Sequence, residues 1–101
     1  MNTKTIQLSD IRLDFQQPEN LLEHTVLEYV NKIMHGEEIP PIRVRFDGTN
    51  YFCEDGFHRL EASRRVGATT IQAEIFPGTL EQMEAEYREY LKELRKSLSG
   101  E

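Results

Sequence analysis

The chain has 101 residues, with 12 Lys and Arg against 18 Asp and Glu, a net charge of −6 and a single cysteine. This length suits one compact core and leaves no room for a second domain of ordinary size. One thiol cannot form an intramolecular disulfide, no apolar run approaches the ~20 residues of a membrane span, and the N-terminus shows no apolar signal core. We therefore expect one cytoplasmic domain without a membrane segment. Its excess of acidic residues disfavours the binding of polyanions over a broad surface, so any contact with nucleotide or nucleic acid must be local.

The first part of the chain predicts a strand followed by a helix. Residues 5–13 alternate polar and apolar side chains, as one half-buried strand or two short ones do. From about Leu21 to His35, apolar residues recur at spacings of three and four. Gly36 follows as the expected left-handed helix stop.

The middle of the chain predicts a β-hairpin, a short helix and a further strand. Residues 42–46 alternate strictly after a Pro-Pro pair that forbids helix, turn residues follow, and residues 51–53 form the return strand. Asp55-Gly56 breaks this strand. The apolar positions beyond it fit a short helix ended by Gly67, and residues 71–75 alternate as a last strand.

The C-terminal part carries the most regular pattern. Between residues 80 and 98, apolar side chains step by three or four over about five turns, while the other faces are charged. This stripe either packs on the domain's own sheet or meets a partner helix, or its first half docks and its second half stays free. The predicted order is β-α-ββ-α-β-α, an α+β fold with a small mixed β-sheet over residues 1–78 and an amphipathic helix over 79–101.

The chemistry concentrates where the hairpin turns into the short helix. Free backbone N–H groups and the positive end of the helix dipole meet there, so an anion such as phosphate finds donors. Gly56 lets the anion approach the backbone, Arg59 grips its oxygens in a fork, and His58 adds a donor. Asp55 and Glu54 are the candidate catalytic groups, through a divalent metal or by accepting a proton. The alternative is a common Asp-Gly turn, with Asp55 as a helix cap and the His-Arg pair in solvent.

Two more basic residues lie two apart on the first hairpin strand. Arg43 and Arg45 share one face of that strand, because side chains alternate between faces. Either they extend the phosphate-binding surface toward Gly56, or they form the exposed polar face of a half-buried sheet. The histidines His24 and His35 lack the partner set of a zinc site, so we predict no metal held by the protein alone.

Three stretches resemble a known family. The run Asp55-Gly56-Phe57-His58-Arg59-Leu60-Glu61-Ala62, followed by Arg64-Arg65-Val66-Gly67, resembles the signature of the ParB/sulfiredoxin superfamily, whose Gly-x-(His/Arg)-Arg box opens a helix and binds nucleotide phosphates. Upstream, the ParB pattern Gln-Pro-Arg, helix, Gly, Pro-x-x-Val-Arg is similar to Gln17-Pro18, Gly36 and Pro41-Ile42-Arg43-Val44-Arg45. The resemblance implies this fold and a ligand such as ATP, ADP or CTP, with or without magnesium.

Several residues depart from the family pattern, and these differences reduce the number of family functions that we expect of this chain. Phe57 stands where sulfiredoxins have their catalytic cysteine, so sulfinic acid reduction is not expected. Compared with chromosome-partitioning ParB, the box differs at Phe57, His58 and Glu61, Glu19 replaces an arginine, and the helix-turn-helix region is missing. Specific DNA binding is therefore not expected. The Asp-Gly-x-His-Arg form also resembles ADP-dependent free-serine kinases of the superfamily, in which the aspartate matching Asp55 takes part in catalysis.

These observations leave three functions open. The first is a minimal nucleotide-dependent enzyme, such as an NTPase or phosphotransferase, acting at residues 54–59. The second is a non-catalytic nucleotide-sensing or protein-interaction module, whose C-terminal helix meets a second copy of the chain or another protein. A nuclease is third, because the acidic surface disfavours polyanionic substrates.

Overall fold

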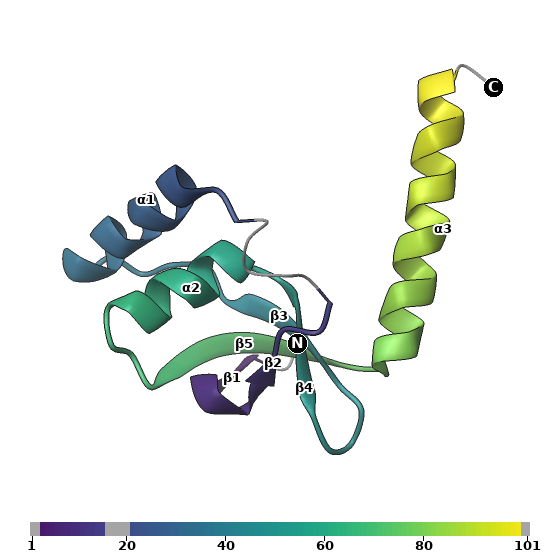
Figure 1. Cartoon of the computed structure of the whole chain (residues 1–101). Coiled ribbons are helices and arrows are strands. Elements are labelled where there is room, and N and C mark those ends of the chain that lie inside the picture. Colours follow the sequence, from purple (N-terminus) through teal and green to yellow (C-terminus); the bar gives the residue numbers. More distant parts are fainter. Residues whose placement is uncertain (1–2, 16–20, 100–101) are drawn as a thin grey trace.

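The computed structural model describes residues 3–15 and 21–99 (Figure 1). The elements are β1 (Thr3–Gln7), the 3₁₀ turn η1 (Leu8–Asp10), β2 (Ile11–Arg12), α1 (Glu23–Met34), β3 (Ile42–Phe46), β4 (Tyr51–Asp55), α2 (Phe57–Arg65), β5 (Thr70–Pro77) and α3 (Leu80–Ser99). This arrangement confirms the α+β class, and the alternating stretch at residues 5–13 forms two short strands around η1. Gln17-Pro18 and Glu19, part of the upstream resemblance, lie outside the described residues.

The five strands form one mixed sheet in the order β1-β5-β3-β4-β2. β1 pairs antiparallel with β5, and β3 pairs antiparallel with β4 as the predicted hairpin. β3 runs parallel to β5, and β2 runs parallel to β4. The hairpin therefore lies inside the sheet, and the end of β4 that leads into α2 sits next to the start of β3.

The hydrophobic core lies between the sheet and α2. Ile42 and Val44 of β3 are fully buried together with Cys53 of β4, and Phe57 and Leu60 of α2 belong to the same cluster. α1 packs against α2 on this side of the sheet (Figure 1). Burial of each large side chain stabilises the fold by roughly 1.5–3 kcal/mol. This packing fixes the position of the β4–α2 turn.

α3 leaves the domain after β5 and stands away from the sheet (Figure 1). Among the described side chains of α3, only Met83 is buried. Glu86 accepts a 2.7 Å hydrogen bond from Arg45, and the ring of Tyr87 meets that of Phe15 edge-on at 5.5 Å. These contacts hold the first two turns of α3 against the rest of the domain. The stripe does not pack on the sheet along its length, because a helix of 20 residues is about 30 Å long and soon passes the sheet.

No helix within the described ranges combines the length and the apolar character that a membrane crossing needs.

Candidate functional site

The candidate site forms where β4 turns into α2. Gly56 precedes α2 with a φ of +93°, a left-handed conformation that residues with a Cβ rarely adopt. A Cβ added there would lie 2.7 Å from Cγ2 of Ile42 and 3.0 Å from Nη2 of Arg59. Both the turn and the close approach of β3 therefore require glycine at this position.

The first turn of α2 offers backbone donors. The helix begins with a 2.9 Å hydrogen bond from the N–H of Leu60 to the carbonyl of Gly56. Within residues 3–15 and 21–99, no side chain caps this end. The carboxylate of Asp55 accepts the N–H of Gly56 at 2.9 Å, so the alternative in which Asp55 caps the helix is wrong. The backbone N–H groups of the first turn of α2 make no hydrogen bond within the helix. They lie at the positive end of the helix dipole, so both favour an anion there.

A pocket of about 270 Å³ opens beside this turn. It is lined by Asp55, Gly56, Phe57, His58 and Arg59, and by Thr25 and Tyr29 of α1. Its volume lies near the lower limit for small-molecule sites, which suits the phosphate end of a ligand.

Sequence reasoning missed Thr25 and Tyr29. These residues lie four apart on one face of α1, and this spacing is the signal that could have identified them. Only the packing of α1 against α2 shows that this face borders the pocket.

His58 links the starts of the two helices. The N–H of Leu22, at the N-terminus of α1, donates a 3.0 Å hydrogen bond to Nε2 of His58. Because Nε2 accepts this bond, the neutral ring carries its proton on Nδ1, and only Nδ1 can donate to a ligand. The predicted phosphate donor therefore also positions α1 beside the pocket.

Arg59 ties the loop between α1 and β3 to the start of α2. Its Nη1 donates to the carbonyls of Pro41 at 2.9 Å and Pro40 at 3.2 Å. Its Nη2 lies 3.8 Å from the carboxylate of Asp55, a loose contact at the rim of the pocket. The bonds to the loop use only Nη1, so the N–H groups of Nη2 can donate to an anion while Nη1 keeps its bonds to the loop.

The two carboxylates predicted as catalytic do not meet. Asp55 lines the pocket, and its side chain is 68% exposed. Glu54 instead accepts a 3.1 Å hydrogen bond from Nε of Arg45 on the other face of the sheet. Successive side chains of a strand point to opposite faces, so one of these two neighbours had to turn away. In the described part of the chain, no three His, Cys, Asp or Glu side chains gather to hold a metal ion.

The structure also keeps Arg43 and Arg45 away from the pocket. Ile42 and Val44 fill the core under α2, so the alternating arginines lie on the opposite face of β3. The guanidinium of Arg43 lies 4.5 Å from the centre of the Phe76 ring, and Arg45 pairs with Glu54 and Glu86. The arrangement matches the polar-face alternative and not an extension of the phosphate-binding surface.

Cys53 is a buried thiol, and we predict that it resists alkylation in the folded protein. Burial raises its pKa to about 12, from an ordinary value of 9.0. Iodoacetamide at pH 8 should label Cys53 only after unfolding, which mass spectrometry measures. Because the folded pKa is raised, the stability it contributes is present below about pH 9 and is lost as pH rises toward 12. Rapid labelling of the native chain at pH 8 would contradict this assignment.

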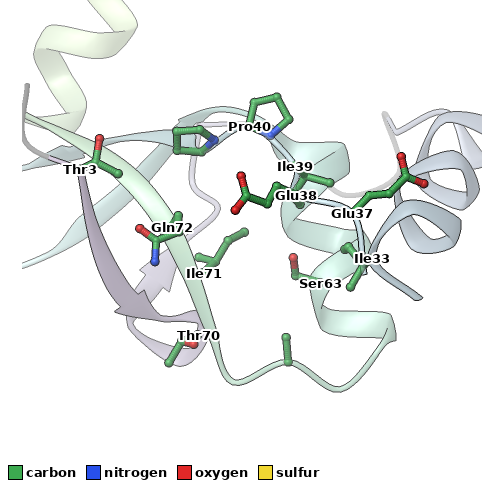
Figure 2. A pocket seen from close by; sticks show the side chains of 12 residues that line it. Thr3, Ile33, Glu37, Glu38, Ile39, Pro40, Ser63, Thr70, Ile71 and Gln72 are labelled. Carbon is green, nitrogen blue, oxygen red and sulfur yellow. The ribbon is translucent and has the colours of Figure 1, made fainter. Parts of the chain in front are cut away.

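A second cavity, of about 570 Å³, lies beside the α1–β3 loop. Pro40 and Pro41 line it, while their carbonyls bond to Arg59. Figure 2 shows the carboxylate of Glu38 pointing into this cavity, between the loop and β5. The loop therefore lines the larger cavity and is held by Arg59, which lines the smaller one.

Comparison with solved structures shows the same fold in proteins of different function. Sulfiredoxin from Arabidopsis thaliana is similar with a TM-score of 0.74 and 26% identity, over 84% of this chain and 96% of that chain. The C-terminally truncated ParB from Caulobacter crescentus, complexed with CTP-gamma-S, is similar with a TM-score of 0.66 and 18% identity, over 82% of this chain and 48% of that chain. The same ParB complexed to the centromeric parS site gives a TM-score of 0.60.

Sequence comparison adds a curated relative and a family. The BEACH domain-containing protein lvsE of Dictyostelium discoideum is 41% identical over 68 residues, or 61% of this chain. The chain spans only 3% of the length of that protein. The family described as the ParB N-terminal domain matches residues 1–91. The chain therefore belongs to the ParB N-terminal domain family.

Proposed function

We propose that this domain binds a nucleotide through its phosphates at the pocket between α1, β4 and α2. One observation carries the proposal: the Gly56 turn places an uncapped helix start and the guanidinium of Arg59 on the same small pocket. Backbone N–H groups at a helix start and an arginine fork are the donors that phosphate oxygens accept best. The complex of Caulobacter crescentus ParB with CTP-gamma-S supports a nucleotide as the ligand.

The charges around the pocket explain how a chain with a net charge of −6 would hold an anion. Arg65 bonds to Glu23 at 2.6 and 2.8 Å and to Glu61 at 3.0 Å, and Arg64 bonds to Glu61 at 3.2 Å, so carboxylates balance both charges. Arg59 bonds instead to neutral carbonyls, with Asp55 only loosely placed. Among the described residues that line the pocket, Arg59 therefore carries the positive charge that a phosphate would compensate.

The carboxylate of Asp55 disfavours the binding of a phosphate without magnesium and favours the binding of a phosphate that carries magnesium. An exposed carboxylate at the rim repels phosphate oxygens. Magnesium is commonly held by substrate phosphates together with one or two carboxylates, and Asp55 fits that part. We propose that Asp55 contacts the magnesium that a bound nucleotide brings with it.

Calorimetric titration with ATP, ADP and CTP, with and without magnesium, tests this function. Arg59→Ala should weaken binding at least about tenfold, because a charge-assisted bond to phosphate is lost. Arg43→Ala is the matched control, since it removes the same charge from the opposite face and should leave binding unchanged. Asp55→Asn should weaken binding only when magnesium is present.

Two results would contradict the proposal. One is the absence of binding for all three nucleotides in both conditions. The other is an equal loss in Arg43→Ala and Arg59→Ala, which would reflect net charge and not a site.

A single carboxylate in the pocket favours nucleotide sensing over phosphoryl transfer. With Glu54 turned to the other face, only Asp55 remains as a candidate base or metal ligand among the described lining residues. A phosphate-release assay should therefore show no turnover with the nucleotide that binds. Phosphate release by the wild type that is lost in Asp55→Asn would instead support phosphoryl transfer at this pocket.

A further inference from the structure

The larger cavity beside the α1–β3 loop has the size and the lining of a small-molecule site. Its volume of about 570 Å³ lies within the range of roughly 300–1,000 Å³ that such sites occupy. Apolar side chains form most of its wall, among them Ile33, Ile39, Pro41, Ala68 and Ile71. Sites of this kind combine an apolar wall with a few polar groups that select and orient the ligand.

Glu38 places a negative charge in this cavity. Its carboxylate points into the cavity, while that of Glu37 is turned the other way, toward α1 (Figure 2). Among the described residues, Glu38 has no hydrogen bond or ion pair, and no Lys, Arg or His side chain lines the cavity. A carboxylate beside an apolar wall and without a protein partner is matched by a cation.

The surroundings of Glu38 favour an organic cation over a metal ion. A metal ion needs several oxygen, nitrogen or sulfur ligands, and the residues that the structure describes form no group of three that could hold one. The wall opposite the carboxylate is apolar, so it suits hydrocarbon attached to the cationic group.

Ser63 of α2 supplies a second polar group. The residue is only 5% exposed, and Figure 2 shows its hydroxyl pointing into the cavity, toward the loop that carries Glu38. This hydroxyl has no hydrogen bond to another described residue. Since no described side-chain oxygen is both fully enclosed and without a partner, the hydroxyl stays open to what fills the cavity.

We propose that this cavity binds a small organic amine, with the ammonium group against Glu38 and the apolar body against the wall. The ammonium donates charge-assisted hydrogen bonds, which a carboxylate accepts strongly, and the hydroxyl of Ser63 accepts a bond from the same end of the ligand. The cavity shares no described lining residue with the pocket at Gly56. The amine therefore binds without a nucleotide.

A titration of the isotope-labelled full chain, followed by two-dimensional NMR without nucleotide, tests the site. It compares cyclohexylmethylamine, which is protonated at neutral pH, with cyclohexylmethanol, which has nearly the same shape and no charge. The amine should bind at least about fivefold more tightly, because only its charge is matched by Glu38. The amide signals of Ile39, Ser63 and Ile71 should shift.

Substitutions separate the charge from the hydroxyl. Glu38→Gln should weaken binding of the amine at least about fivefold and leave binding of the alcohol unchanged. Glu84→Gln removes the same charge from α3 and is the matched control, with no expected effect. Ser63→Ala should weaken binding of both probes about twofold or more, because the hydroxyl meets either head group. The same spectra show whether each variant is folded.

Four results would overturn the proposal. The first is the absence of shifts with either probe, and the second is equal affinity for the amine and the alcohol. The third is equal weakening by Glu38→Gln and Glu84→Gln, since net charge would then explain the effect. The fourth is a set of shifts centred on Gly56 and Arg59, which would place the amine at the carboxylate of Asp55. Unchanged binding of both probes to Ser63→Ala would contradict the role given to the hydroxyl.

Discussion

Gly56→Ala should lower the free energy of unfolding by about 2–5 kcal/mol, a large fraction of the stability of a small domain. Part of this loss comes from placing alanine at a φ of +93°, and part from a Cβ that would lie 2.7 Å from Cγ2 of Ile42. The second contribution is severe because Ile42 is fully buried and has no space to move. Urea denaturation followed by circular dichroism measures the change.

Gly67→Ala is the matched control for this variant. Gly67 lies just beyond the other end of α2 with a φ of +83°, and nothing lies within 4 Å of an added Cβ. Its replacement should cost only the backbone strain, about 1–2 kcal/mol. Equal losses in the two variants would show that the approach of β3 to the turn contributes nothing.

Local patterns in the sequence were sufficient to predict the helices and strands. Gly36, Gly56 and Gly67 all have positive φ values, at 75°, 93° and 83°, and each lies at a helix boundary that the sequence predicts. A requirement for a left-handed residue depends on the chain immediately around it, so it can be read without the fold. The same is true of the alternation that predicts β3 and β4.

The composition of the site depended on contacts that the sequence does not reveal. Alternation along β3 shows that Arg43 and Arg45 share a face, but only the packing of α2 decides which face that is. The separation of Glu54 from Asp55 is different, because alternation along the strand already implies that these neighbours point in opposite directions, and the structure shows only that Asp55 is the one at the pocket. Of the seven predicted site residues, the pocket contains Asp55, Gly56, His58 and Arg59.

The C-terminal helix shows a different limit. Its apolar stripe indicates that a hydrophobic partner exists, but the pattern is the same whether that partner is the sheet or another helix. Leu94 and Leu98 lie 14 and 18 positions beyond Leu80, or roughly 20–27 Å along the helix. The predicted docking on the sheet thus holds only for the first turns, where Met83 is buried.

Ile42→Ala should cost about 2–5 kcal/mol, because it removes a fully buried side chain and leaves a cavity between β3 and α2. The loss matters for the site as well as for the fold. Ile42 lies beneath Gly56, and the adjoining Pro41 and Pro40 accept the hydrogen bonds of Arg59. Thermal denaturation should show a melting temperature lower by roughly 8 °C or more.

Combining Ile42→Ala with Gly56→Ala separates the two causes of strain at the turn. Removing Cγ2 of Ile42 relieves the 2.7 Å contact, although Cβ of residue 42 stays 3.0 Å from the added methyl group. The double variant should therefore lose about 0.5–3 kcal/mol less than the two single losses added together. Val44→Ala provides the control, since Val44 is equally buried on the same strand but is not among the atoms nearest to Gly56. Its loss should add to that of Gly56→Ala without coupling, and additivity in both pairs would mean that the contact with Ile42 does not contribute to the need for glycine at position 56.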